Sequence, residues 1–194
     1  MKYILTCILL FSISRASELA IGSVMPEVNH KMLGINGNKY SLKDVKGEKG
    51  TLVIFSCNTC PWVIKWEDRY VSISESYIPK GISVIGVNSN IARFGGDDSL
   101  DKMKEHATKK GYNFPYVQDS DAKLAKAFGA KKTPHIYLFD TRDRLVYRGA
   151  IDDNARDASS VDEHFLSNAI EELIADQPIS KPISKAIGCS IKFN

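Results

Sequence analysis

The chain alternates short apolar runs with segments in which apolar residues recur every three or four positions. Two runs, residues 51–55 and 82–87, are short and rich in β-branched residues, which is typical of buried strands. From Pro61 to about Ile78 the apolar side chains recur at spacings of three and four, which predicts a helix with one buried stripe. The order strand, helix, strand predicts the centre of an α/β fold.

Further elements flank this centre. Asn36 and Gly37 lie between two short apolar segments, which predicts a hairpin with a type I′ turn. Ser160 and Glu163 fit a capping box, which predicts the start of the last helix. The elements between them are a helix, a short strand, a helix and a hairpin, expected at residues 99–110, 116–117, 121–128, and 136–139 with 144–148. This order predicts an α/β sandwich with a mixed sheet flanked by helices.

The last part of the chain has a different character. Residues 176–194 hold Pro178 and Pro182 within a near-repeat of Pro-Ile-Ser-Lys. These prolines disfavour a helix, because proline lacks the backbone N–H that a helix interior needs. We expect one domain over residues 20–175 and an extended C-terminal tail over residues 176–194 that lies on it.

The N-terminus has the pattern of a signal peptide. Lys2 precedes an apolar run over residues 3–13, and small residues follow up to Ala16. The run is shorter than the roughly 20 residues that span a bilayer. We expect residues 1–16 to be removed and the mature protein to be exported without stable membrane insertion. Its destination is the periplasm in a bacterium and the secretory pathway otherwise. A buried N-terminal strand or helix is the alternative interpretation.

Composition narrows the class of protein. The 194 residues are 43% hydrophobic and 25% charged, which indicates an ordinary globular domain. The formal net charge of +3 gives no basic surface for nucleic acid. Four cysteines are too few for a disulfide-stapled miniprotein of this length, but enough for one redox or metal site. Cys7 lies in the predicted signal peptide, so the mature chain has three.

Two of these three form a CxxC motif, Cys57 and Cys60, between a predicted strand and a predicted helix. The unpaired N–H groups and the dipole of a helix N-terminus favour a thiolate there, and a second nearby thiol resolves a mixed disulfide. The motif therefore predicts a redox pair that needs no organic cofactor. Half a zinc site and a structural disulfide are the alternatives. A zinc site needs further ligands, and the sequence has no second CxxC and no HxxxH.

Thr133-Pro134 directly precedes the predicted strand over residues 136–139. A CxxC after one strand and a Thr-Pro before a later strand resemble the thioredoxin superfamily. The resemblance implies a cis bond before Pro134, in a loop that faces the cysteines. It also implies that the Thr133 backbone pairs with an extended substrate peptide. Trp62, beside the cysteines, is expected either in the core or in this docking surface.

The N-terminal hairpin and the helix over residues 99–110 are similar to the redoxin branch of that superfamily. This branch includes AhpC/TSA-type peroxiredoxins and TlpA/ResA-like oxidoreductases. Four segments resemble exported thioredoxin-family proteins: Cys57-Asn58-Thr59-Cys60-Pro61-Trp62-Val63, Lys132-Thr133-Pro134-His135, residues 147–154 and Gly188-Cys189-Ser190-Ile191-Lys192. The likeness covers about residues 20–194. It implies a thiol-disulfide oxidoreductase that acts on protein thiols and disulfides and on a separate redox partner.

In this interpretation Cys57 attacks, Cys60 resolves, and Thr133 and Pro134 shape the docking groove. Three positions depart from better-known members. Ser56 stands where thioredoxins have tryptophan, and Thr51 stands where they have a buried acid. No arginine stands near Pro134, where peroxiredoxins have the one that polarises peroxide.

Three alternatives remain open. A thiol peroxidase would use Cys60 on peroxide, with Cys57 or Cys189 resolving. A Sco-like module would bind copper through Cys57, Cys60 and His135. A binding module would share the fold and have an inert cysteine pair. Cys189 itself is expected either to pack the tail onto the domain or to act as a resolving thiol.

Overall fold

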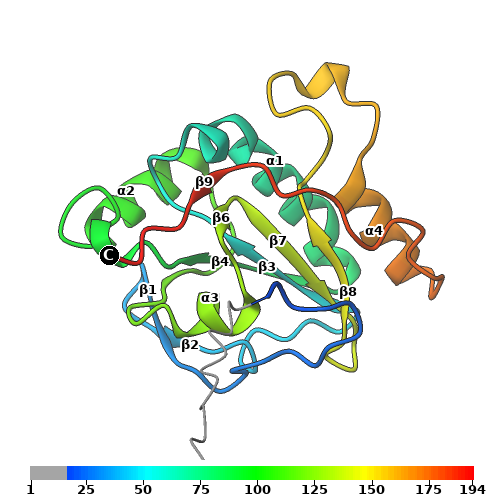
Figure 1. Cartoon of the computed structure of the whole chain (residues 1–194), viewed down its shortest axis with the longest axis horizontal. Helices are drawn as coiled ribbons and strands as arrows, with labels where there is room; N and C mark the ends of the chain where they lie inside the picture. Colours follow the sequence, from blue (N-terminus) through cyan, green and yellow to red (C-terminus); the bar gives the residue numbers. More distant parts are fainter. Residues whose placement is uncertain (1–16) are drawn as a thin grey trace, which may run out of the picture.

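The computed structural model describes residues 17–194, and Figure 1 shows their arrangement. The predicted signal peptide, residues 1–16, lies outside the described residues. A seven-stranded mixed sheet forms the centre, in the order β2-β1-β5-β4-β3-β7-β8. Its strands, in chain order, are β1 (Met32–Gly34), β2 (Lys39–Tyr40), β3 (Gly50–Phe55), β4 (Ile82–Asn88), β5 (Tyr116–Gln118), β7 (His135–Phe139) and β8 (Leu145–Gly149). The helices are α1 (Pro61–Tyr77), α2 (Leu100–Lys110), α3 (Lys123–Phe128) and α4 (Phe165–Ile174).

The mixed α/β sandwich expected from the sequence is confirmed, and its central strand explains where the site lies. β3 pairs parallel with β4 and antiparallel with β7. Every residue of β3 is buried, which fits an uninterrupted apolar run between two neighbouring strands. The strand ends at Phe55, so the chain leaves the middle of the sheet just before Cys57.

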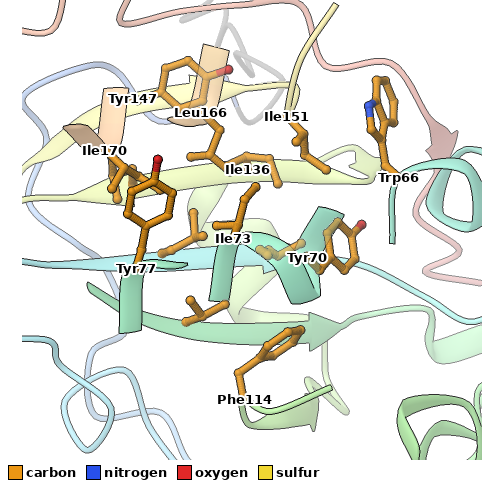
Figure 2. Close-up of a cluster of buried hydrophobic side chains, with 14 of the residues drawn as sticks. Trp66, Tyr70, Ile73, Tyr77, Phe114, Ile136, Tyr147, Ile151, Leu166 and Ile170 are labelled. Carbon is orange, nitrogen blue, oxygen red and sulfur yellow. The ribbon is translucent and has the colours of Figure 1, made fainter. Parts of the chain in front are cut away.

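One face of the sheet is covered by α1 and α4. The apolar stripe of α1 includes Trp66, Tyr70, Ile73 and Tyr77, and Figure 2 shows these side chains lying over the strands. Leu166 and Ile170 of α4 join the same cluster, as do both cysteines of the CxxC motif. The opposite face packs against α3 and the segment before β1. None of the described helices is long and apolar enough to cross a membrane.

Two local predictions were wrong. The predicted hairpin forms, since β1 pairs antiparallel with β2, but its turn is not of type I′. Gly37 has a φ of 82°, whereas Asn36 is not in the left-handed region, and a type I′ turn needs both. The last helix begins at Phe165, so Ser160 and Glu163 do not cap it. Instead Asp157 accepts the Ser160 hydroxyl at 2.8 Å and caps a short 3-10 turn, η3 (Ala158–Ser160). A capping box needs its serine directly before the first helical residue, but His164 occupies that position.

The C-terminal tail is extended and runs from α4 back across the molecule (Figure 1, red). It first lies beside the edge strand β8. There Arg148 donates its backbone N–H to the Pro182 carbonyl at 3.0 Å, and Ser184 donates to the Arg148 carbonyl at 3.1 Å. Further along, β9 (Cys189–Ser190) pairs antiparallel with β6 (Lys132–Thr133) in a second, two-stranded sheet.

Candidate active site

The two cysteines of the CxxC motif lie directly before α1. Cys60 is the N-cap residue and Pro61 is the first helical residue, where its missing N–H costs nothing. Both cysteines are free thiols, with exposed fractions of 2% for Cys57 and 4% for Cys60. The pair is therefore unbonded and buried, in the segment between the end of β3 and the start of α1.

A cis Thr133-Pro134 bond, as the resemblance implied, brings Thr133 over the pair. The Cys57 Sγ lies 3.3 Å from the Thr133 hydroxyl, and the Cys60 thiol donates to the Thr133 carbonyl at 3.1 Å. Thr133 and Pro134 are themselves buried. Thr133, the last residue of the short strand β6 before β7, thus contacts both sulfurs.

The two sulfurs are electrostatically unequal. A hydrogen bond from the Cys57 thiol lowers the pKa of Cys60, against the effect of burial, and the Cys189 thiol and the Val63 backbone N–H act in the same direction. The Thr133 carbonyl opposes part of this, because it accepts a hydrogen bond only from the thiol. Donating that hydrogen bond to Cys60 raises the pKa of Cys57, and burial raises it further. These directions favour a thiolate on Cys60 over one on Cys57.

A buried carboxylate that the sequence analysis did not single out holds the loop between the cysteines. Asp98, in the loop before α2, is completely buried. It accepts the backbone N–H of Asn58 at 2.8 Å and the side-chain amides of Asn88 and Asn90 at 2.9 and 3.0 Å. Its charge adds to the raised pKa of Cys57. Asp98 sits in a polar stretch that reads as a solvated loop, so only the fold brings it to the site.

The remaining sequence candidates fall in different places. Trp62 is half-buried and packs against Trp66, with ring centroids 6.0 Å apart, so it belongs partly to the core and partly to the surface. Cys189 is half-buried on the same apolar cluster as the cysteine pair. Its backbone is the register partner of Thr133. The tail therefore carries the third thiol into the site.

His135 does not join the cysteines. It is fully buried beside Tyr137, whose hydroxyl is 3.3 Å from its Nδ1, and burial lowers its pKa to about 3. Among the described residues, a search for three or more metal-ligating side chains that meet within 4.8 Å finds one group, and it contains neither His135 nor a cysteine. The copper set expected as an alternative is therefore not assembled.

That one group consists of His30, Asp119 and Asp121. Asp119 already accepts the Ser89 hydroxyl at 2.8 Å and the backbone N–H groups of Leu124 and Ala125 at the start of α3. Both carboxylate oxygens of Asp119 thus already accept hydrogen bonds that hold the start of α3 in place. We assign the group a structural role.

A sandwich of this topology, with a cysteine pair at the N-terminus of its first long helix, defines a thioredoxin-like protein. The chain belongs to the Redoxin family, whose model matches residues 20–164. This family supports an oxidoreductase of the thiol-disulfide or the peroxidase type. A search of curated proteins found no significant match.

Solved structures agree with this family. The chain is 34% identical to an uncharacterized conserved protein from Geobacillus kaustophilus, with a TM-score of 0.83 over 90% of this chain and 93% of that one. It is 28% identical to a hypothetical protein from Sinorhizobium meliloti 1021, with a TM-score of 0.84 over 92% and 97%. The thioredoxin domain of a thiol-disulfide oxidoreductase from Bacteroides vulgatus shares the fold, at 24% identity and a TM-score of 0.63 over 81% and 99%.

Proposed function

We propose that the protein is a thiol-disulfide oxidoreductase that exchanges disulfides with protein substrates through Cys57 and Cys60. The observation that carries this proposal is the difference between the two cysteines: the pKa of Cys60 is lowered and the pKa of Cys57 is raised. Cys60, at a helix N-terminus, has a lowered pKa and attacks as the thiolate, whereas Cys57, whose pKa is raised, stays protonated until it resolves the mixed disulfide. Both sulfurs lie under one residue of the loop before β7.

The reaction runs in two exchanges. The Cys60 thiolate attacks one sulfur of a substrate disulfide, the substrate S–S bond breaks, and its other sulfur leaves as a thiolate that takes up a proton. Cys57 then loses its proton and attacks the Cys60 Sγ. The mixed disulfide breaks, and the substrate leaves with both thiols reduced. The chain keeps a Cys57–Cys60 disulfide, which a separate redox partner reduces by the same steps.

This order of attack reverses the roles that the motif suggested from sequence. The motif assigned attack to Cys57 because its sulfur was expected at or just before the helix N-terminus, where a thiolate is favoured. The lowered pKa of Cys60, to which Cys57 and the Val63 backbone N–H contribute, supports attack by Cys60 instead.

Trapping experiments test both the activity and the order. They use residues 17–194 in a Cys189→Ser background, so that the third thiol cannot take part. With a peptide disulfide as substrate, Cys57→Ser should accumulate a mixed disulfide on Cys60, and Cys60→Ser should accumulate none. The opposite pattern would restore attack to Cys57. Substrate reduction that survives both substitutions would end the proposal.

A peroxidase is the second candidate, favoured by the low pKa of Cys60. The Cys60 thiolate would attack one oxygen of a hydroperoxide, giving a sulfenic acid and an alcohol or water. Cys57 would then form the disulfide and release water. Stopped-flow consumption of hydrogen peroxide that depends on Cys60 and outpaces disulfide exchange would place this activity first.

We also propose that the protein works outside the cytosol, in an oxidising compartment, because of the apolar run and small residues before position 17. The proposal is tested by N-terminal sequencing of the protein recovered from cells that express the full chain. A start near residue 17 supports export. An intact Met1 in the cytosolic fraction contradicts it.

A further inference from the structure

The C-terminal tail occupies the surface that lies directly over the cysteine pair. β9 pairs antiparallel with β6, with Cys189 opposite Thr133 and Ser190 opposite Lys132. The Ile191 backbone N–H continues the ladder by donating to the Lys131 carbonyl at 3.0 Å. An extended segment thus pairs with the backbone of the loop before β7, which is the way strand addition binds a peptide.

The fit of the tail against this loop is close. A Cβ on Gly188 would stand 2.3 Å from the Thr133 carbonyl oxygen and 3.1 Å from the Pro134 nitrogen, so only glycine fits there without a shift of the backbone. Two residues beyond the cysteine, Ile191 is buried in the core cluster beside α3, with an exposed fraction of 6%. The tail is therefore seated on both sides of Cys189.

The cysteine of this segment meets the redox pair. Thr133 is opposite Cys189 in the ladder, and the same residue accepts the Cys60 thiol at 3.1 Å. The Cys189 thiol and backbone N–H both contribute to the lowered pKa of Cys60. Burial and the contact with Cys60 raise the pKa of Cys189. Cys189 thus stands beside Cys60 as a protonated thiol.

We propose that the tail is a built-in substrate: residues 188–191 take the place of an extended client peptide, and Cys189 exchanges disulfides with Cys60 within the same chain. This inference rests on the proposed oxidoreductase function and names what its site binds. It also gives the class of client that fits. Such a client is an extended segment with glycine before its cysteine and an aliphatic residue two positions after it.

The exchange needs no outside reagent. Starting from the Cys57–Cys60 disulfide, Cys189 loses its proton and attacks the Cys60 Sγ. The Cys60–Cys189 bond forms, the Cys57–Cys60 bond breaks, and the electron pair leaves on Cys57, which takes up the proton. The chain thus holds one disulfide, which is either Cys57–Cys60 or Cys60–Cys189. The Cys60–Cys189 disulfide ties the tail covalently to the site, whereas the Cys57–Cys60 disulfide leaves the tail free to be displaced by a client peptide.

Disulfide mapping of the mature chain, residues 17–194, tests the exchange. Cys57→Ser protein is oxidised with oxidised glutathione at low protein concentration, quenched in acid, alkylated and analysed by mass spectrometry. We expect a Cys60–Cys189 bond within one chain as the main product. Glutathione that stays on Cys60 with Cys189 free would overturn the inference, and so would a Cys60–Cys189 bond found only between chains. Either of these results leaves the proposed function intact, because Cys60 has still exchanged.

Competition with a client gives a second, independent readout. Gly188→Ala should loosen the tail, so exchange with a Gly-Cys-Ser-Ile peptide disulfide should accelerate severalfold. Gly95→Ala is the matched control, because a Cβ there meets nothing within 4 Å. Equal rates in Gly188→Ala, Gly95→Ala and the parent chain would show that the tail does not compete, and would overturn the inference. The mapping above stands alone if Gly188→Ala does not fold.

Discussion

At the scale of single residues, the charge on Cys60 has a consequence for stability. Its pKa lies below the ordinary thiol value of about 8.5, which the unfolded chain keeps. Between those two pKa values the unfolded chain binds more protons than the folded one. The free energy of unfolding of the reduced protein therefore rises with pH through this window, and the gain is lost as pH falls through the folded pKa. Cys57, whose pKa is raised, stays protonated in the folded state, and in the unfolded chain it loses its proton only as pH approaches the ordinary thiol value of about 8.5.

We therefore expect the reduced protein to be more stable near pH 8 than near pH 5, and Cys60→Ser to remove most of that difference. Urea unfolding of the reduced chain at several pH values measures it. Thr59→Ala is the control, because Thr59 is exposed between the two cysteines. If the free energy of unfolding of the parent chain does not rise between pH 5 and pH 8, Cys60 does not carry the thiolate in the reduced protein.

Asp98 yields the second prediction. Asp98→Asn removes the negative charge that accepts three N–H groups. It also replaces one accepting oxygen with an NH₂ group, which would face N–H donors. We expect a loss of about 1–3 kcal/mol in the free energy of unfolding. We also expect a lower pKa for Cys57, because the nearby negative charge is gone. Urea unfolding and the pH dependence of alkylation of Cys57, in a Cys60→Ser background, measure the two effects.

Asp97→Asn is the matched control, since Asp97 is an exposed neighbour whose side chain lies 3.7 Å from Arg93. It should change the free energy of unfolding by less than about 0.5 kcal/mol. Equal effects of the two substitutions would mean that Asp98 does not hold the loop between the cysteines.

At this scale the sequence predicted the cysteine pair and Thr133-Pro134, because local motifs carry them. Asp98 was out of reach, because its role depends on a loop about forty residues from the cysteines. His135 was misplaced as a copper ligand for a related reason. Thr133 contacts the cysteines, but His135 packs beside Tyr137, which belongs to the core cluster of the other sheet face.

At the scale of elements, α1 is held by a polar contact within an apolar stripe. The Trp66 indole donates to the buried Asp152 carboxylate at 2.8 Å, and Arg69 pairs with the same carboxylate at 3.0 Å. Trp66→Phe keeps an aromatic ring but removes the donor. We expect a loss of about 1–3 kcal/mol in thermal or urea unfolding, against a smaller loss for Trp62→Phe, whose indole is half-buried. Equal losses would contradict this role for Asp152.

The tail gives the prediction that belongs to a whole segment. Ile191 is buried, whereas 38% of Ile187 is exposed, so we expect Ile191 and not Ile187 to anchor the tail. Ile191→Ala should weaken the docked tail by about 2 kcal/mol, which raises the open fraction more than tenfold. Limited trypsin cleavage after Lys185 should accelerate accordingly, while Ile187→Ala should cleave at the parent rate. Equal cleavage of the two variants would show that Ile191 does not hold the tail down.

Elements were predicted well where an apolar pattern is long, as in β3 and α1, because periodicity reports directly on burial. They were predicted poorly where a short motif alone marked a boundary. Ser160 and Glu163 fit a capping box in sequence, but Ser160 lies in the 3-10 turn η3 and the helix begins only at Phe165. The prolines correctly indicated an extended tail, but nothing local to residues 188–191 says which loop they pair with.

At the scale of the molecule, the fold brings three segments that are distant in sequence together beyond the end of β3. The cysteine pair follows β3, Thr133 lies in β6, and Cys189 lies in β9 of the tail, which pairs with β6 in the second, two-stranded sheet. The three thiols differ in their surroundings: the pKa of Cys60 is lowered, the pKa of Cys57 is raised, and Cys189 lies in a strand of the tail. The fold follows from the order of elements in sequence, whereas the meeting of the three thiols follows only from how the tail folds back.

The most direct test of the central claim is the redox equilibrium of the pair itself. Residues 17–194 with Cys189→Ser are equilibrated over a range of reduced and oxidised glutathione, quenched in acid, and mapped by mass spectrometry. We predict a Cys57–Cys60 disulfide that forms and disappears reversibly as the ratio changes, with a single midpoint. A pair that stays reduced, or stays oxidised, over the whole range would contradict a role in disulfide exchange.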